Sequence, residues 1–407
     1  MIKRFGIGER YWRKNILSSS IRSATDSRLA VLHLPALLGY KLGCILVSLG
    51  ILVSASGGSW DITNHLLNKP ESFFSAPHGM LYAGVASALL GCIIMSRQCK
   101  YSYGFSESFR KPTMLVITGI TMLIVAGPVD FAWHSAFGLD GLLSPPHFVL
   151  LTGMIISSLG SLIGLIVSKG RNDTNDGSYI QHHKRFSPSL FFMRLPTSIL
   201  LAIIGVIPIW LSLAGIIGMF SLPFSKTQYF DFNPDPSLGA VVATVGYPLL
   251  LSSIMISSFR FGRNRFGVIS LTALTYVAIS AATVIIPNES LVPTLPFYFL
   301  NMIPIVAVDI LLTLAKSRFY YPIYLIGGAI LGSIFFMMQY PLITHVYNEV
   351  GTTRGFVWPS LTSQTYFEMI QEIYPLVAIP GATMGIIGAA VANIAINKNL
   401  STLMSKG

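Results

Sequence analysis

The sequence predicts an all-α polytopic membrane protein with about ten transmembrane helices. Of its 407 residues, 11% are charged and 52% are hydrophobic, whereas soluble domains carry about 25% charged residues. The apolar residues form continuous runs, and a helix needs about 20 such residues to cross a bilayer. Continuous rather than alternating runs favour helices over a β-barrel. The expected spans are 35–56, 79–96, 112–129, 148–168, 196–220, 239–257, 266–286, 296–315, 320–340 and 373–395.

The distribution of basic residues predicts how these spans are oriented. The net charge is +11, with Lys and Arg concentrated before the first span and in every second loop. Cytoplasmic loops of membrane proteins collect these residues, so we expect a multi-pass protein of the cell membrane with both termini in the cytoplasm. The charge is therefore a topology signal, with some attraction to anionic lipid. No nucleic-acid-binding module is recognisable, and the expected environment is the lipid bilayer.

We expect four parts along the chain. Residues 1–30 are basic with interleaved aromatic residues, which suits either an interfacial helix or a frayed terminus. Residues 31–168 form a four-span module, 169–195 a polar cytoplasmic linker, and 196–407 a six-span membrane domain. No cleavable signal peptide is evident, so the first span is expected to be retained. The three cysteines do not have the spacing of a zinc finger or a disulfide framework.

The four-span module contains one motif twice, Asp-x₃-His-x₁₂-His. Each copy joins the end of one span to the start of the next, so the duplicated unit is a two-helix hairpin, and both copies have the same orientation. On the predicted topology both motifs lie on the outer face. The first copy is Asp61, His65 and His78, with Glu71, Ser75 and Pro77; the second is Asp130, His134 and His147, with Asp140, Ser144 and Pro146 at the matching positions.

The spacing of the motif indicates a metal site. Asp and His four residues apart share one face of a helix, and the second His opens the next span behind a Ser that suits an N-cap. A short loop returns that His to the first pair. Two imidazoles and one carboxylate suit first-row transition metals and leave positions open for solvent, oxygen or substrate. Alternatively, these are hydrogen-bonded polar residues at helix ends.

The second copy resembles the C subunit of the copper membrane monooxygenases, the superfamily of particulate methane monooxygenase and ammonia monooxygenase. The shared pattern is Asp130-x₂-Trp133-His134, then Asp140 and a Pro-x-His finish at His147, within residues 55–155. The resemblance implies copper ligation near the membrane surface by the Asp, His and His of each copy. The C subunit of that family carries the motif once, whereas this chain carries it twice. The first copy also departs from the family pattern, because Asn64 replaces the Trp and Glu71 replaces the second Asp.

Two functions from different classes follow. The first is a copper-dependent membrane monooxygenase, or a subunit of one, that oxidises a small apolar substrate; iron and zinc are less favoured metals. The family also uses a partner subunit with a periplasmic cupredoxin-like domain, which no outer segment here is long enough to form. Glu71 and Asp140 would orient ligand imidazoles, and Trp60 and Trp133 would shield the site or anchor the interface. No catalytic residue is assigned.

The second function is copper or zinc binding and transport without oxygenase activity. In that hypothesis the later spans pass the metal inward and use Asp309, a carboxylate within the expected span 296–315. Ionisable residues inside a membrane commonly mark such pathways, although Asp309 also suits a hydrogen-bonded packing role. A third possibility is that bound metal only staples the two hairpins together.

Overall fold

The computed structural model contains helices and turns, and the described residues include no β-strand. The predicted all-α class is therefore confirmed for these residues. The described residues are 36–64, 72–101, 107–137, 143–175, 197–221, 236–315 (with gaps at 263, 288, 290–291, 293–294 and 301), 320–335 and 369–405. The predicted N-terminal segment 1–30 and most of the linker 169–195 lie outside them, although the helix that precedes this linker continues to Asn175.

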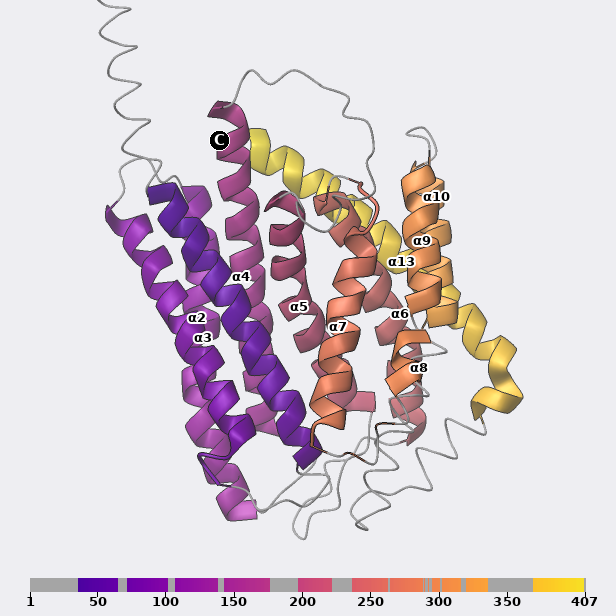
Figure 1. The fold of residues 1–407 in the computed structure, drawn as a ribbon, viewed down its shortest axis with the longest axis horizontal. Helices are drawn as coiled ribbons and strands as arrows, with labels where there is room; N and C mark the ends of the chain where they lie inside the picture. The colour runs from indigo at the N-terminus through magenta and orange to yellow at the C-terminus, as the bar shows by residue number, and fades with distance from the viewer. Residues whose placement is uncertain are drawn as a thin grey trace, which may run out of the picture.

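Eight of the described helices are long and apolar enough to cross a membrane, which makes the chain a multi-pass membrane protein. The first of them, Ala36–Asn64, has no label in Figure 1, where it is the indigo helix. The others are α2 (Ala76–Tyr101), α3 (Glu107–Phe137), α4 (Pro145–Asn175), α5 (Thr197–Ser221), α6 (Pro236–Phe261), α7 (Val268–Ile285) and α13 (Met369–Ser405).

Two of the ten expected spans fall on shorter apolar helices. The region 296–315 contains α8 (Leu295–Leu300) and α9 (Met302–Leu314). Pro304 is in the first turn of α9, where a proline is tolerated because that turn has no internal partner for its N–H. The region 320–340 contains α10 (Tyr320–Ile330), which continues as a five-residue π-helix, η4 (Leu331–Phe335). The count of ten therefore remains a prediction.

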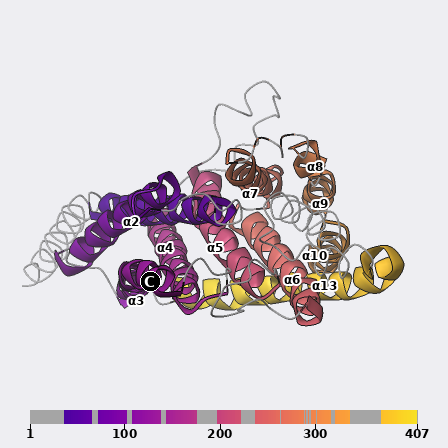
Figure 2. The same ribbon diagram turned by 90° about the horizontal axis from the view of Figure 1, so that it is seen from below.

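The helices form one elongated bundle. In Figures 1 and 2 the Ala36–Asn64 helix, α2, α3 and α4 lie together on one side, and α7 to α10 lie on the other. Helix α13 runs obliquely along one face and packs against α6, α10 and η4. Helices α4 and α5 join the two sides. A hydrogen bond between the hydroxyls of Ser59 and Thr283, 2.9 Å long, also links the Ala36–Asn64 helix to α7.

Small residues bring the helices of each N-terminal hairpin into backbone contact. A Cβ placed on Gly50 would lie 2.5 Å from the carbonyl oxygen of Gly84 on α2. A Cβ placed on Gly119 of α3 would lie 2.5 Å from the carbonyl oxygen of Gly153 on α4. Such contacts are common between membrane helices, where small residues allow close approach. Both members of the second pair lie 69 positions after those of the first, the same offset that relates the two metal motifs.

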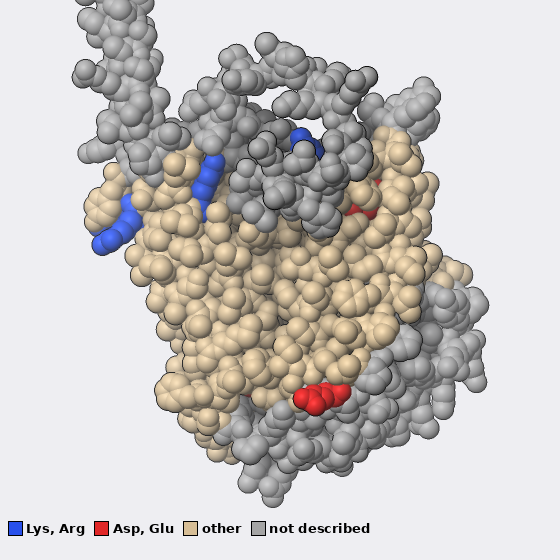
Figure 3. Space-filling view, viewed as in Figure 1, with Lys and Arg blue, Asp and Glu red and all other residues tan. Residues whose placement is uncertain are grey.

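The surface has an apolar middle and charged ends. Figure 3 shows Lys and Arg at one end of the bundle and a broad central band without them. Helix α2 ends in the basic residues Arg97 and Lys100, and Arg110 and Lys111 lie in the first turns of α3. Because α2 and α3 begin and end at opposite ends of the bundle, these basic residues lie far from the metal motif, which occupies the start of α2 and the end of α3.

Candidate metal centre

The second copy of the motif is built from the end of α3 and the start of α4. Asp130 and His134 are one turn apart near the C-terminus of α3, and His147 is in the first turn of α4. Ser144 directly precedes α4, and its hydroxyl accepts a 3.4 Å hydrogen bond from the backbone N–H of His147. This is the N-cap that the sequence predicts, and it holds His147 at the point where the chain returns toward α3.

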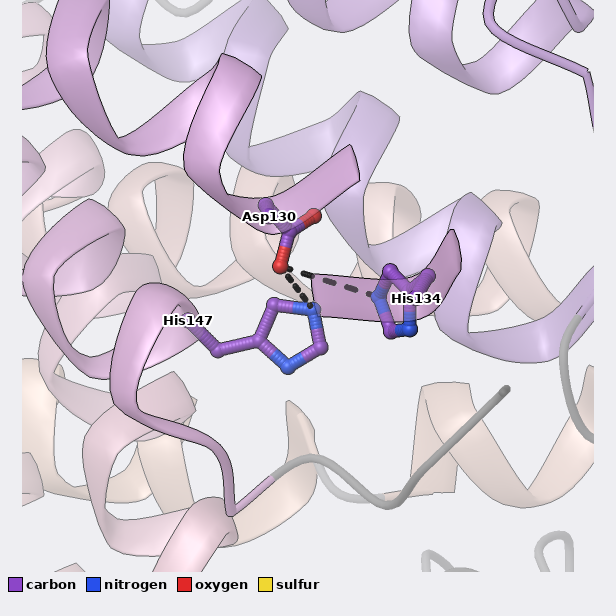
Figure 4. Close-up of side chains that lie close together, drawn as sticks. All are labelled: Asp130, His134 and His147. Carbon is purple, nitrogen blue, oxygen red and sulfur yellow. Dashed lines mark ion pairs between the residues drawn. The ribbon is translucent and has the colours of Figure 1, made fainter. Parts of the chain in front are cut away.

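The three side chains converge on one point. Oδ1 of Asp130 lies 3.6 Å from Nε2 of His134 and 3.2 Å from Nε2 of His147, as Figure 4 shows. One ligand atom from each residue lies within 4.8 Å of the other two. The side chains are 9–18% exposed, so the cluster is largely withdrawn from solvent. Of the described residues, only this trio forms a group of three potential metal ligands.

The donor set fits a metal ion. Oδ1 of Asp130 is buried and makes no hydrogen bond of acceptable geometry, even though two imidazole nitrogens lie close to it. Oδ1 is therefore not committed to a hydrogen bond and lies beside two imidazole nitrogens. One ligand atom from each residue is near enough to the other two for the group to hold a metal ion, for which an ordinary Zn–N bond is about 2.0–2.1 Å long. The sequence predicted that Asp130, His134 and His147 lie close together, and the structure places them so.

The first copy shows the same contact between its outer members. Nε2 of His78 lies 3.1 Å from Oδ2 of Asp61. Nδ1 of His78 lies 3.0 Å from the backbone carbonyl oxygen of Ser72, an orienting contact of the kind that metal-binding histidines commonly make. The third predicted ligand, His65, lies outside the described residues, as do the predicted orienting residues Glu71 and Asp140.

Aromatic rings connect the two copies. The ring of Tyr82 stacks on His78 at 5.9 Å between centroids, and Phe73 contacts Tyr82 at 5.1 Å. Phe73 also contacts Phe131 at 5.2 Å, and Phe131 is the residue after Asp130. The two copies are therefore neighbours at the same end of the bundle, joined through a chain of rings. Trp133, a predicted shielding residue, packs on Phe137 at 4.6 Å.

Asp309 has a structural task in the fold. It is fully buried on α9, and its Oδ2 accepts hydrogen bonds from the backbone N–H of Gly267 and of Ser270 and from the Ser270 hydroxyl, at 3.0, 3.0 and 2.6 Å. These groups begin α7, whose N-cap is a glycine without a capping side chain. A carboxylate is favourable at a helix N-terminus, so Asp309 caps α7 from a neighbouring helix.

Sequence reasoning missed two groups around the first copy. One is the Ser72 carbonyl, which no side-chain pattern reveals because every residue has a backbone carbonyl. The other is the amide oxygen of Asn64, which is buried and has no hydrogen-bond partner among the described residues. The sequence signal that pointed to this second group is that the first copy has Asn64 at the position where the second copy has Trp133.

Comparisons with protein-family models, with curated proteins and with solved structures found no match. The class of the protein therefore rests on its fold and its site. It is a helical multi-pass membrane protein with a candidate Asp/His/His metal site.

Proposed function

We propose that the protein is an integral membrane metal-binding protein with two outward-facing Asp/His/His sites that bind copper. The observation that carries this proposal is the convergence of Asp130, His134 and His147, whose ligand atoms lie within 4.8 Å of one another. Two of the three donors are imidazole nitrogens. Imidazole suits copper, zinc, iron and nickel, and copper(II) has the highest affinity of the divalent first-row metals at a given site of this kind.

A second site in the first copy is supported by two independent observations. The Asp61–His78 contact of 3.1 Å matches the Asp130–His147 contact of 3.2 Å. The glycine pairs Gly50–Gly84 and Gly119–Gly153 pack their hairpins at corresponding positions. We infer that the hairpin is duplicated and that His65 completes the first site, as His134 completes the second.

An outer location of the sites is supported by the charge of the hairpins. Arg97 and Lys100 end α2, whereas His78 begins it. If basic ends face the cytoplasm, the metal motifs of both hairpins face outward and the termini lie inside. The two short regions α8–α9 and α10–η4 then complete ten crossings, an even number that agrees with both termini on one side.

The resemblance to the C subunit of copper membrane monooxygenases supports an oxidative role at these sites. In this proposal the protein is a subunit of an oxidoreductase for a small apolar substrate, with Glu71 and Asp140 orienting imidazoles and a separate subunit supplying a periplasmic copper-binding domain. Transport of copper or zinc is the alternative. Asp309 caps α7, and this structural role accounts for its carboxylate without a transport path.

The experiment that tests the metal sites is elemental analysis with copper electron paramagnetic resonance on detergent-purified protein. We expect two copper equivalents in the wild type and one in each of His65→Ala and His134→Ala. His182→Ala, a histidine outside both motifs, is the matched control and should retain two. No bound metal in the wild type after loading with copper or zinc would overturn the proposal. Co-purification of a subunit with a copper-binding domain then separates the enzyme from the transporter.

A further inference from the structure

The carboxyl group of Asp309 has one oxygen in full use and one oxygen without a partner. Oδ2 accepts three hydrogen bonds from the start of α7. Oδ1 is buried and has no hydrogen-bond partner among the described residues, and the side chain as a whole is 0% exposed. Buried polar atoms are nearly always paired, so Oδ1 marks a position for a partner that the protein itself does not supply.

No opposite charge lies on the helices around this carboxyl group. The described helices that pack on α9 are α7, α8, α10 and η4, and none of them contains Lys, Arg, His, Asp or Glu. Arg265, in the turn before α7, is exposed. Arg260, at the end of α6, donates hydrogen bonds to Asn393 and Asn397 of α13. The remaining titratable side chains on these helices are Tyr276, Tyr298, Tyr320, Tyr321 and Tyr324.

Two effects act in opposite directions on the charge of Asp309. The start of α7 favours the ionised carboxylate, because a helix N-terminus attracts negative charge. The 2.6 Å contact from the Ser270 hydroxyl also has the length of a hydrogen bond to an ionised oxygen. Burial without a counter-charge favours the neutral acid, because a charge removed from water is costly. A proton on Oδ1 removes that charge and still leaves Oδ2 as an acceptor.

A proton fits Oδ1 better than a metal ion does. A metal ion needs several ligands around it, and of the described residues only Asp130, His134 and His147 form a group of three potential His, Cys, Asp or Glu ligands. A proton needs only the one oxygen. Solvent reaches the neighbourhood, because Arg265 and Phe266, directly before the capped end of α7, are exposed.

We propose that Asp309 is a proton-binding site whose occupancy controls the start of α7. While Oδ1 is unprotonated, the carboxylate holds the N–H groups of Gly267 and Ser270 by charge-assisted hydrogen bonds, which are about twice as strong as neutral ones. When Oδ1 takes up a proton from water, the same bonds become neutral and the first turn of α7 loosens. The site is separate from the metal motifs, so it does not depend on the proposed copper binding.

Infrared spectroscopy of the full-length protein in detergent, recorded at a series of pH values, tests the proton site. Subtraction of the Asp309→Asn spectrum at each pH isolates the C=O band of protonated Asp309. We expect this band to grow with a single midpoint as the pH falls. A band present at every pH at which the protein is folded, or absent at every such pH, would overturn the proposal.

Two further variants assign the midpoint to the contacts of the carboxyl group. Ser270→Ala removes the hydroxyl that donates to Oδ2, so the ionised form loses support and the midpoint should rise by about one pH unit, a tenfold gain in proton affinity. Thr313→Val is the matched control, because the Thr313 hydroxyl donates to the backbone carbonyl of Asp309 and not to its carboxyl group; its midpoint should not move. Equal shifts in both variants would overturn the assignment. If Asp309→Asn does not fold, a band that Ser270→Ala moves and Thr313→Val does not identifies the carboxyl group in its place.

Hydrogen exchange measured by mass spectrometry reports on the start of α7. Wild type and Asp309→Asn are compared at the same pH, so the intrinsic dependence of amide exchange on pH cancels. We expect the segment with Gly267 and Ser270 to exchange more slowly in the wild type while Asp309 is ionised, and this difference to disappear as the infrared band appears. A band that titrates while the difference in exchange stays constant would overturn the control of α7 by the proton.

Discussion

His78 and Ser72 are joined by a 3.0 Å hydrogen bond between ring Nδ1 and the backbone carbonyl oxygen. A carbonyl only accepts, so Nδ1 carries the hydrogen, and in the neutral ring the lone pair is on Nε2. Nε2 lies 3.1 Å from Oδ2 of Asp61. A protonated ring donates a second hydrogen bond there, whereas a neutral ring turns its lone pair toward the carboxylate, where the proposed metal would lie between the two atoms. In both cases the Ser72 carbonyl fixes the orientation of the ring toward Asp61.

Substitution of His78 by Asn separates the two roles of the ring. The Asn amide N–H takes the place of Nδ1–H and retains the bond to Ser72, but the variant has no atom at the place of Nε2. We expect one metal equivalent fewer than in the wild type and a metal-free melting temperature close to the wild-type value. His78→Ala, which loses both contacts, should lose the metal and also melt lower. Retention of both metal equivalents by the Asn variant would contradict this prediction.

Metal should stabilise the protein against heat, because the second site joins the end of α3 to the start of α4. A ligand that binds only the folded state stabilises it by about 2.7 kcal/mol at a concentration of 100 times its dissociation constant. We expect copper to raise the melting temperature, a chelator to reverse the rise, and Asp130→Asn to reduce it. Glu107→Gln breaks an exposed ion pair with Lys111 on the same helix, a kind of pair that contributes little, and should leave the rise unchanged.

The sequence allowed the hairpins and the second site to be predicted because their geometry is local. Four-residue spacing places Asp130 and His134 on one helix face, and the short connection to α4 returns His147. The other features depend on tertiary structure. The bond from His78 to the Ser72 carbonyl and the capping of α7 by Asp309 join groups with no sequence signature. Likewise, an apolar run at 296–315 does not show that Asp309 on α9 reaches the first residues of α7.

The close approach of α3 and α4 makes a matched pair of glycine variants informative. A Cβ on Gly119 would lie 2.5 Å from the carbonyl oxygen of Gly153, whereas a Cβ on Gly127, two turns further along α3, would meet no atom within 4 Å. We expect Gly119→Ala to separate the two helices, lower the melting temperature and reduce metal occupancy of the second site. Gly127→Ala should leave both measurements near the wild-type values. Equal behaviour of the two variants would show that this contact does not hold the hairpin together.

Replacement of Asp309 tests whether its role is structural. Asp309→Leu leaves the N–H groups of Gly267 and Ser270 without their acceptor, and each unsatisfied buried donor costs about 1–3 kcal/mol. We expect a clear fall in melting temperature with metal stoichiometry retained in the protein that remains folded. Asp309→Asn keeps an acceptor oxygen, so its melting temperature should fall less. A transport role predicts the opposite pattern, in which Asp309→Asn abolishes metal flux into vesicles while stability is retained.

The orientation of the hairpins can be tested with single cysteines at the two ends of α2. Phe74, 82% exposed, precedes α2 at the metal end, and Tyr101, 68% exposed, is its last residue at the basic end. Cys99 is half-buried near that second end, so the background carries Cys99→Ser. We expect a membrane-impermeant maleimide to label Phe74→Cys in intact cells and Tyr101→Cys only after permeabilisation, because basic helix ends are retained in the cytoplasm. The reverse pattern would place both metal motifs on the cytoplasmic side, where a periplasmic partner domain has no access to them.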